Sequence, residues 1–239
     1  MPDRAALVTG GSSGIGLAIA RALGEDGYGV TVSARRPDKL DEAVKQLEEA
    51  GLDVQQVVAN MSEEDDIKAL AEAHRERYGR LDVLVNNAGI GIGGQIADAE
   101  TKRLDLQLDV NLRGVYLMTR EAIPMLRHAG REHGKALVLN MSSIAGKYGQ
   151  PWLAAYSATK AAVVGLSQAT QGELQNDGVQ VTAFCPGFVA TPMTDWNEAV
   201  PKDEMIQPDD IVEAVRFLLR TSRNCLVPEI MFVRPSDRM

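Results

Sequence analysis

Short apolar runs alternate with longer amphipathic segments along the chain, and this alternation limits the folds that the chain can adopt. The short runs have the length and composition of strands and lie at Ala5–Thr9, Val30–Ala34, Val54–Ala59, Leu81–Asn86, Ala136–Met141, Val179–Cys185 and Ile230–Val233. The segments between them have the length of helices. Alternating strands and helices predict a parallel sheet with helices on both faces. We therefore expect an α/β fold with a doubly wound parallel sheet of about seven strands.

The longer segments are expected to form helices at 15–26, 37–50, 62–78, 102–131, 152–176 and 208–220. Ser62 is expected to cap the third helix, whose first turn is acidic. The chain shows no linker or repeat, so residues 1–239 are predicted to form one domain rather than two small ones. The main irregular stretch, about 191–207, is the expected lid or substrate loop.

The charge of the chain excludes several kinds of partner. The net charge is −8, from 25 basic and 33 acidic residues. This balance argues against a nucleic-acid partner and against an anionic membrane surface. No apolar run approaches the ~20 residues of a membrane span. A phosphorylated cofactor is not excluded, because N–H groups at a helix start can bind an anion locally.

The cysteines and histidines point to no disulfide and no metal. Two cysteines are too few for a disulfide scaffold, and Cys185 is expected to be a buried thiol at the end of an apolar run. With an N-terminus unlike a signal peptide, this favours a reducing cytoplasm. His74, His128 and His133 lie in charged stretches and are expected to be solvated, so we predict no metal site.

A glycine-rich turn, Thr9-Gly10-Gly11-Ser12-Ser13-Gly14-Ile15-Gly16, follows the first strand and opens the first helix. Glycine permits backbone angles and close approaches that a Cβ would forbid. The N–H groups of the turn and helix start would face an anion, ideally a pyrophosphate. An ordinary glycine-rich turn is the alternative, but the place of this one in a βαβ unit favours a dinucleotide site.

The end of the second strand bears on which dinucleotide would bind. An acidic residue is expected there to bind the ribose 2′-hydroxyl of NAD. Ala34 takes that position instead, and Arg35 and Arg36 follow it. Because guanidinium groups bind phosphate with two hydrogen bonds, the sequence favours the 2′-phosphate of NADP, with NAD as the less favoured cofactor.

Three side chains suited to proton transfer lie in the second half of the chain. Tyr156 and Lys160 are four residues apart and would share one face of a helix, and Ser143 lies thirteen residues before the tyrosine. A nearby cation would lower the pKa of the phenol, which is about 10 in free tyrosine. The serine hydroxyl could hold a substrate oxygen. A surface tyrosine beside a solvated lysine is the alternative to acid–base chemistry at an alcohol or carbonyl.

Together these motifs resemble the short, single-domain branch of the short-chain dehydrogenase/reductase family over nearly the whole chain. The glycine turn is similar to that family's Thr-Gly-x-x-x-Gly-x-Gly. The other matching segments, in the family's order and spacing, are Asn86-Asn87-Ala88-Gly89, Asn111, the Ser143, Tyr156 and Lys160 core, and Pro186-Gly187 with Thr191. The resemblance implies a Rossmann-like fold and an NAD(P)-dependent oxidoreductase.

The resemblance also implies a role for each matching residue. Tyr156 would donate a proton to a carbonyl, and Lys160 would lower its pKa and bind the nicotinamide ribose. Ser143, preferred to its neighbour Ser142, would hydrogen-bond the substrate oxygen, and Asn111 would bind a water that links Lys160 to solvent. The expected cofactor-binding residues are Gly10, Ser12, Ser13, Gly14, Ile15, Gly16, Arg35, Arg36, Asn60, Asn87, Ala88, Gly89, Tyr156, Lys160, Pro186, Gly187, Val189 and Thr191.

Some residues depart from the family's pattern. Asn60 stands where the family often has an aspartate near the adenine. The turn Asn176-Asp177-Gly178 is acidic where carrier-protein ketoreductases tend to be basic, which argues against an acyl-carrier-protein partner. The apolar residues of the irregular stretch are expected to close over the core more readily than to face a ligand. They are Met193, Trp196, Val200, Met205 and Ile206.

The sequence therefore predicts a cytoplasmic, NADP-preferring oxidoreductase that interconverts a ketone or aldehyde with its alcohol. Small residues on the Tyr156 helix, and the dimer face that the family forms there, imply a homodimer or homotetramer. The first alternative is a non-catalytic NAD(P)H-binding sensor on the same fold, and the second is a structural oligomer. A sensor would need the glycine turn but not Asn111, Ser143, Tyr156 and Lys160 together, so the sequence favours an enzyme.

Overall fold

A single parallel sheet of seven strands, in the order β3-β2-β1-β4-β5-β6-β7, forms the centre of the molecule. The structure is a computed structural model that describes residues 2–235 and 237. The strands are β1 (Ala5–Thr9), β2 (Gly29–Ala34), β3 (Val54–Val58), β4 (Val83–Asn86), β5 (Ala136–Met141), β6 (Val179–Pro186) and β7 (Glu229–Phe232). The predicted doubly wound α/β fold is confirmed.

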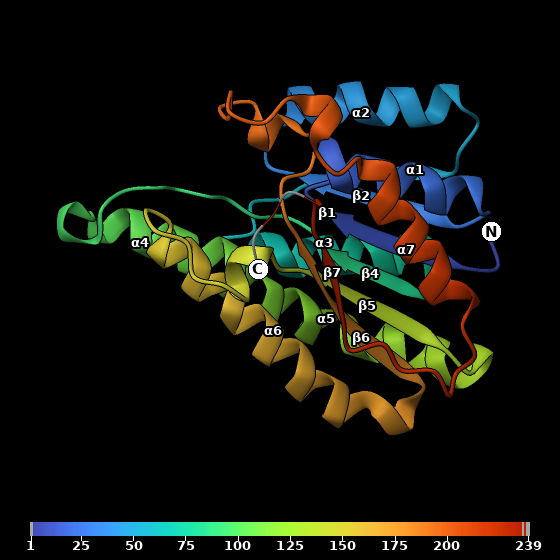
Figure 1. The fold of residues 1–239 in the computed structure, drawn as a ribbon. Helices are drawn as coiled ribbons and strands as arrows, with labels where there is room; N and C mark the ends of the chain where they lie inside the picture. The colour runs from blue at the N-terminus through green and yellow to red at the C-terminus, as the bar shows by residue number, and fades with distance from the viewer. Residues whose placement is uncertain (1, 236, 238–239) are drawn as a thin grey trace.

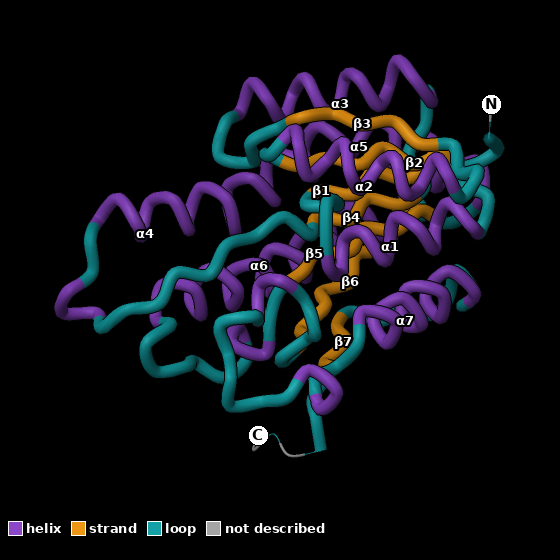
Figure 2. Tube along the Cα trace, turned by 90° about the horizontal axis from the view of Figure 1, so that it is seen from above, coloured by secondary structure: helices purple, strands orange, loops and turns teal. Residues whose placement is uncertain are grey.

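Helices cover both faces of the sheet (Figures 1 and 2). One face carries α1 (Gly14–Glu25), α2 (Pro37–Glu49) and α7 (Pro208–Arg220). The other carries α3 (Glu64–Tyr78), α5 (Gly114–His133) and α6 (Ala154–Leu174), and α4 (Thr101–Leu108) extends beyond the sheet's edge. Among the described residues, no helix combines the length and apolar character that a membrane crossing requires.

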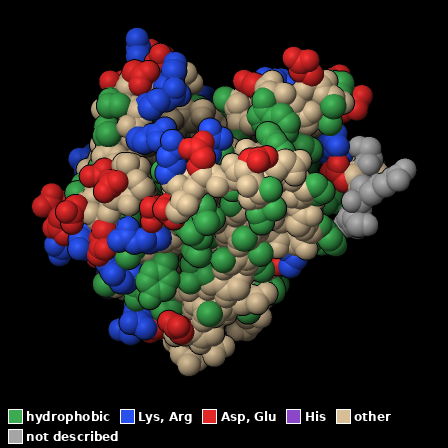
Figure 3. Space-filling model, turned by 90° about the vertical axis from the view of Figure 1, so that its left-hand side faces the viewer, with side chains coloured by type: hydrophobic (Ala, Val, Ile, Leu, Met, Phe, Trp, Pro, Cys, Tyr) green, Lys and Arg blue, Asp and Glu red, His purple; other side chains and the backbone are tan. Residues whose placement is uncertain are grey.

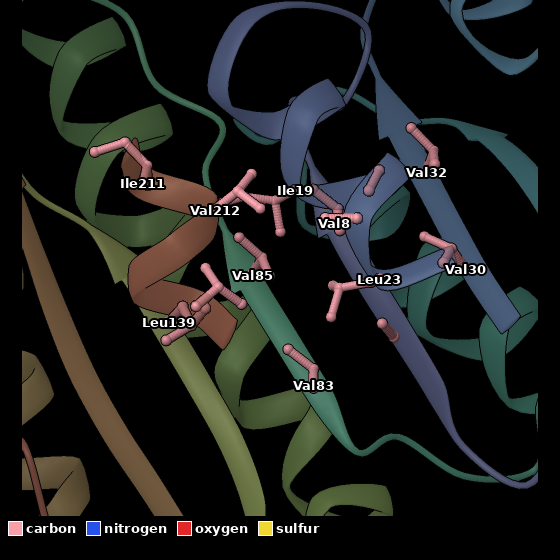
Figure 4. Close-up of a cluster of buried hydrophobic side chains, with 14 of the residues drawn as sticks. Val8, Ile19, Leu23, Val30, Val32, Val83, Val85, Leu139, Ile211 and Val212 are labelled. Atoms are coloured by element: carbon pink, nitrogen blue, oxygen red, sulfur yellow. The ribbon is translucent and has the colours of Figure 1, made fainter. Parts of the chain in front are cut away.

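Side-chain alternation along the strands gives the sheet a separate core on each face. In β1, Val8 packs on the side of Ile19 and Val212, as Figure 4 shows, while Leu7 belongs to the core under α3 and α5. Because both faces are covered, the central strands are buried along their length and appear in the sequence as continuous apolar runs. This is why the central strands could be located from the sequence.

The sheet reverses its strand order at β1, which pairs with β2 on one side and with β4 on the other. Successive crossovers leave in opposite directions from this point, so a crevice opens beyond the carboxyl ends of the strands. The glycine turn follows β1 and Asn87 follows β4. Ser143 follows β5 and Gly187 follows β6. The topology therefore brings the predicted site segments to one edge of the sheet.

The expected helix at 102–131 is divided by a π-helical turn, Asp109–Arg113, between α4 and α5. A π turn places one extra residue in the helix and often occurs at functional sites. Asn111 lies in this turn and is fully buried. Its amide donates to the carbonyl of Ile90 at 2.8 Å and accepts from the N–H of Ile90 at 2.8 Å. The turn thus supports the segment that follows β4.

Two local expectations were wrong. The third helix begins at Glu64 with Glu63 at its N-cap, and Ser62 donates to the Glu63 carboxylate at 3.1 Å instead of capping the helix. His74 is fully buried rather than solvated. Its ring nitrogens lie 2.7 Å from the Thr31 hydroxyl and 2.9 Å from the Arg80 carbonyl, so both polar atoms are satisfied inside the protein.

Candidate active site

A cleft of about 310 Å³ opens at the carboxyl edge of the sheet, a volume typical of small-molecule sites. Every residue predicted for the site lines this cleft except Gly16 and Asn111. One face of the molecule shows a notch between two raised lobes, with Lys and Arg side chains beside it (Figure 3). The residues predicted for catalysis and those predicted for the cofactor thus share one cavity.

The glycine turn leaves the start of α1 open to the cleft. Gly14 has a φ of +55°, and a Cβ there would lie 2.9 Å from Thr191 Cγ2, so both the backbone angle and the contact require glycine. Ser13 is the N-cap of α1, and its side chain makes no capping hydrogen bond. The first N–H groups of the helix therefore have the arrangement that binds phosphate groups.

Thr9 and Asn87 join the end of β4 to the glycine turn. The Thr9 hydroxyl accepts from the N–H groups of Asn87 and Ala88, each at 3.1 Å. The Asn87 amide donates to the carbonyls of Thr9 and Gly10, each at 3.0 Å. A Cβ on Gly16 would lie 2.4 Å from the Asn87 amide nitrogen, so Gly16 lies behind the turn and serves close packing.

The end of β2 forms the basic part of the cleft wall. Ala34 is buried, while Arg35 and Arg36 are exposed and line the cleft. Among the described residues, neither arginine side chain has a hydrogen bond or an ion pair. Ser33 also lines the cleft, and its hydroxyl is buried without a hydrogen-bond partner. A buried hydroxyl and two exposed guanidinium groups would suit the 2′-phosphate end of NADP.

The serines after β5 have different roles. The Ser142 hydroxyl donates to the Lys160 carbonyl at 2.7 Å and so holds the backbone of α6 against β5. The Ser143 hydroxyl accepts from the N–H of Ala145 at 3.1 Å and lies 3.4 Å from the Pro186 carbonyl, a long contact. Both serines line the cleft. The Ser143 hydroxyl therefore donates only a long hydrogen bond within the protein, whereas the Ser142 hydroxyl donates a short one.

Tyr156 and Lys160 share one face of α6, as expected. The Lys160 ammonium donates to the Met141 carbonyl at 2.7 Å and lies 5.6 Å from the centroid of the Tyr156 ring. Burial lowers the pKa of Lys160 to about 8, with Cys185 acting in the opposite direction. The cleft therefore contains a cation held next to a phenol and largely removed from water.

The net shift in the pKa of Tyr156 is opposite to the lowering expected from Lys160. Burial raises the pKa of the Tyr156 phenol, and the neighbouring Ser143 hydroxyl offsets part of the rise. The physical reason is that burial disfavours the phenolate, while Lys160 is directed to the Met141 carbonyl rather than to the phenol oxygen. The phenol is thus protonated at neutral pH.

The irregular stretch after β6 is fixed at both ends. Val189 pairs with Ile206 in a bridge, and the N–H of Ala190 donates to the Ile206 carbonyl at 2.9 Å. Met205 and Ile206 are buried, as expected for residues that close over the core, whereas Met193 and Trp196 are exposed. Of the apolar residues in the irregular stretch, only some therefore contribute to the core.

A sequence model described as short chain dehydrogenase matches residues 4–201, most of the chain. The chain belongs to the short-chain dehydrogenase family. As a short-chain dehydrogenase it is an NAD(P)-dependent oxidoreductase, and the resemblance seen in its motifs is confirmed.

Three relatives of this short-chain dehydrogenase are informative. It is 37% identical to the 3-oxoacyl-(acyl-carrier-protein) reductase FabG of Staphylococcus aureus, over 90% of each chain. It matches an alcohol dehydrogenase from the archaeon Thermococcus sibiricus, complexed with 5-hydroxy-NADP, with a TM-score of 0.89, 31% identity and coverage of 99% and 98% of the two chains. A 3-ketoacyl-(acyl-carrier-protein) reductase from Brucella melitensis, complexed with NADH, matches with a TM-score of 0.87, 30% identity and coverage of 98% of each chain.

Three polar residues around the site of this dehydrogenase have structural roles that the sequence did not predict. Thr9, Ser33 and Ser142 each interrupt an apolar stretch at the end of a strand. That interruption is a signal that could have identified them, because a buried hydroxyl at a strand end needs a partner. The partner of Thr9 lies 78 positions away in the chain at Asn87, which local spacing does not reveal.

Proposed function

We propose that this short-chain dehydrogenase reduces a ketone or an aldehyde to its alcohol with NADPH, and catalyses the reverse oxidation, with Tyr156 as the acid and base. The observation that carries this proposal is the shared cleft, in which Ser143, Tyr156 and Lys160 face the same cavity as the glycine turn. NADPH, when bound, supplies the hydride. The protein then has to hold the carbonyl in place and deliver one proton to its oxygen.

The chain's own residues would divide this work. The Ser143 hydroxyl would donate a hydrogen bond to the carbonyl oxygen and orient it. The Tyr156 phenol would transfer its proton to the same oxygen as the alcohol forms. Its raised pKa keeps that proton in place at neutral pH, which suits the direction of reduction. The Lys160 cation would stabilise the phenolate left behind, in a site where burial strengthens charge interactions.

NADP fits the cofactor end of the cleft better than NAD. Ala34 offers no carboxylate to the ribose 2′-hydroxyl, and Arg35 and Arg36 offer two guanidinium groups to a 2′-phosphate. Both cofactors occur among the relatives, so the preference for NADP is assigned from these side chains rather than from the fold. The cofactor-binding roles of the cleft residues are part of this proposal.

Asn111 has a positioning role in this proposal. Its side chain makes two hydrogen bonds to the backbone of Ile90, so we do not assign it to direct contact with the substrate. A Cβ on Gly89 would lie 3.2 Å from the Lys160 ammonium and 3.4 Å from Asn111 Oδ1, so the two groups face the same narrow space. We assign a water-mediated proton path from Lys160 to this space.

An acyl thioester on a carrier protein is the second candidate substrate. The acidic turn at Asn176-Asp177-Gly178 argued against a carrier-protein partner. Its negative charge is neutralised, because Asp177 pairs with Arg127 at 2.7 Å and with Arg131 at 3.0 Å. Arg131 remains largely exposed. Carrier proteins are acidic, so this corner does not repel them. The relatives named as carrier-protein reductases agree with this candidate.

A panel of ketones, aldehydes and a 3-oxoacyl thioester, assayed by loss of NADPH absorbance, tests the proposal. We expect saturable NADPH oxidation with at least one carbonyl compound. Tight NADPH binding without oxidation by any member would instead identify the cofactor-binding sensor, which none of the relatives favours. We further propose that residues 1–239 act as one cytoplasmic domain within a homodimer or homotetramer.

A further inference from the structure

Both tryptophans of the chain, Trp152 and Trp196, meet beside the cleft. Their ring centroids are 6.4 Å apart, and the ring planes are tilted by 52°. Even so, 52% of Trp152 and 62% of Trp196 are exposed to solvent. Two large aromatic rings that contact each other and still expose more than half of their surface leave a wide apolar area free.

Trp152 adjoins the wall that carries the Tyr156 ring. A Cβ on Gly91 would lie 3.7 Å from the Tyr156 ring, and a Cβ on Gly93 would lie 2.1 Å from the Trp152 ring. The segment from Gly91 to Gly93 thus passes from one ring to the other. Because two residues of extended chain span at most about 7 Å, the Trp152 indole lies close to the reacting end of the cleft.

The backbone holds Trp152 in an unusual conformation. Its φ is +69°, the left-handed region that bulky side chains rarely adopt, and no other described residue except glycine shares it. The N–H of Gly94 donates to the Trp152 carbonyl at 2.8 Å and so fixes the turn. Strained backbone of this kind is concentrated at sites that clamp ligands.

Trp196 lies in the loop that forms the other side of the cleft, just outside the residues that line it. Met193 and Thr194, which line the cleft, lie just before it in the chain. The ring of Phe188, the residue after Gly187, packs edge-on against the Trp196 ring, with centroids 6.4 Å apart. The two indoles therefore meet next to the Tyr156 end of the cleft, one beside the Tyr156 ring and the other after Met193 and Thr194.

We propose that Trp152 and Trp196 form an aromatic corner that binds a flat aromatic group attached close to the substrate carbonyl. A ring in this corner can stack on one indole and direct its edge to the other, and both arrangements favour aromatic pairs over alkyl chains. This inference rests on the proposed reductase function and adds its substrate class, aryl ketones and aldehydes.

The aromatic corner is tested by comparing the reduction of acetophenone and 2-butanone with NADPH. These two methyl ketones differ only in the second group on the carbonyl, a phenyl or an ethyl group. The wild-type enzyme should have a higher kcat/KM for acetophenone. Trp196→Ala and Trp152→Asn, in which asparagine tolerates the left-handed backbone, should each lower this preference about tenfold. Trp196→Phe should keep most of it. Phe217→Ala, on an exposed ring of α7 that does not line the cleft, is the matched control.

The outcomes separate the corner from the reductase function. An unchanged preference in both tryptophan variants would overturn the corner and leave the reductase function intact. If the wild type reduces no member of the carbonyl panel, the reductase function fails, and binding decides the corner by itself. With only two tryptophans in the chain, 1-phenylethanol should produce a saturable shift in indole fluorescence and 2-butanol should not. The absence of that shift overturns the corner whatever the catalytic result.

Discussion

At the scale of single residues, the proposed chemistry depends on an ammonium group that the fold keeps away from water. Lys160 is 3% exposed, and its hydrogen bond to the Met141 carbonyl compensates part of the cost of burying the charge. The Ser142 hydroxyl holds the Lys160 backbone, and a Cβ on Gly146 would lie 2.6 Å from that same backbone. The lysine is thus positioned by neighbours that have no chemical role of their own.

Cofactor preference should depend on the side chains that follow β2. Replacing Ala34 by Asp and Arg35 by Ala introduces a carboxylate and removes a phosphate partner. The kcat/KM with NADPH should fall tenfold to a hundredfold, or about 1.5–3 kcal/mol, and preference should move towards NADH. Steady-state rates with the two cofactors measure this, and Arg220→Ala in the last turn of α7 is the control. A wild type that already prefers NADH contradicts the assignment.

His74 should make stability depend on pH. Burial lowers its pKa from 6.5 to about 4, so between these values the unfolded chain binds the proton and the folded chain does not. The contribution of His74 to the free energy of unfolding should therefore be most favourable above pH 6.5 and fall as the pH decreases, by about 2 kcal/mol between pH 7 and pH 5. Urea unfolding at the two pH values measures this contribution. The free energy of unfolding of His74→Gln should decrease less than that of wild type over this range, whereas that of the control His128→Gln should decrease as in wild type. An equal decrease in all three proteins would show that His74 does not cause this pH dependence.

At the scale of elements, the loop that follows β6 connects the cofactor end of the cleft to its substrate end. Thr191 and Thr194 form reciprocal capping bonds at its start, and Lys202 pairs with Asp195 at 2.6 Å within it. Its middle, which includes Trp196, remains largely exposed. Such a segment is tied at its ends and can still move between them.

Residues 191–206 should therefore become ordered when ligands bind. We expect backbone amides there to exchange hydrogen rapidly in the free protein, more slowly with NADPH, and most slowly with NADPH and a competitive inhibitor. Hydrogen exchange followed by mass spectrometry gives this profile, with α2 as an internal reference. Slow exchange that no ligand changes would show a loop already packed in place, and the lid assignment would be dropped.

The sequence located the strands and most helices because each buried strand is a continuous apolar run. It missed features that depend on contacts distant in the chain. The π turn at Asn111 follows from bonds to Ile90, and the burial of His74 follows from Thr31 and Arg80. The site segments could be identified because they lie at strand ends, whereas the direction of the Lys160 ammonium depends on packing against β5.

At the scale of the whole molecule, an apolar surface remains beyond the edge of the sheet. Leu104, Leu106 and Leu108 on α4 and Tyr116 on α5 are all exposed. Hydrophobic side chains gather on the face shown in Figure 3, the side on which α4 lies in Figure 1. An exposed apolar face of this kind marks an interaction surface. A second copy of the chain is the partner that we propose.

Light scattering should give a mass near twice or four times 25.8 kDa at micromolar concentration. Tyr116→Lys should reduce the mass towards that of a monomer, because a charge in an apolar interface cannot be hydrated. Phe217→Lys, at an exposed position of α7, should leave the mass unchanged. A wild-type monomer at these concentrations contradicts the proposed assembly.

The most direct measurement compares Tyr156→Phe with wild type in both NADPH binding and carbonyl reduction. Phenylalanine keeps the packing of the ring and removes the only proton that Tyr156 can transfer. We expect that NADPH affinity, measured by calorimetry, stays unchanged while kcat falls about a hundredfold or more. Lys160→Ala should weaken both. Full turnover in purified Tyr156→Phe would contradict the assignment of Tyr156 as the acid and base.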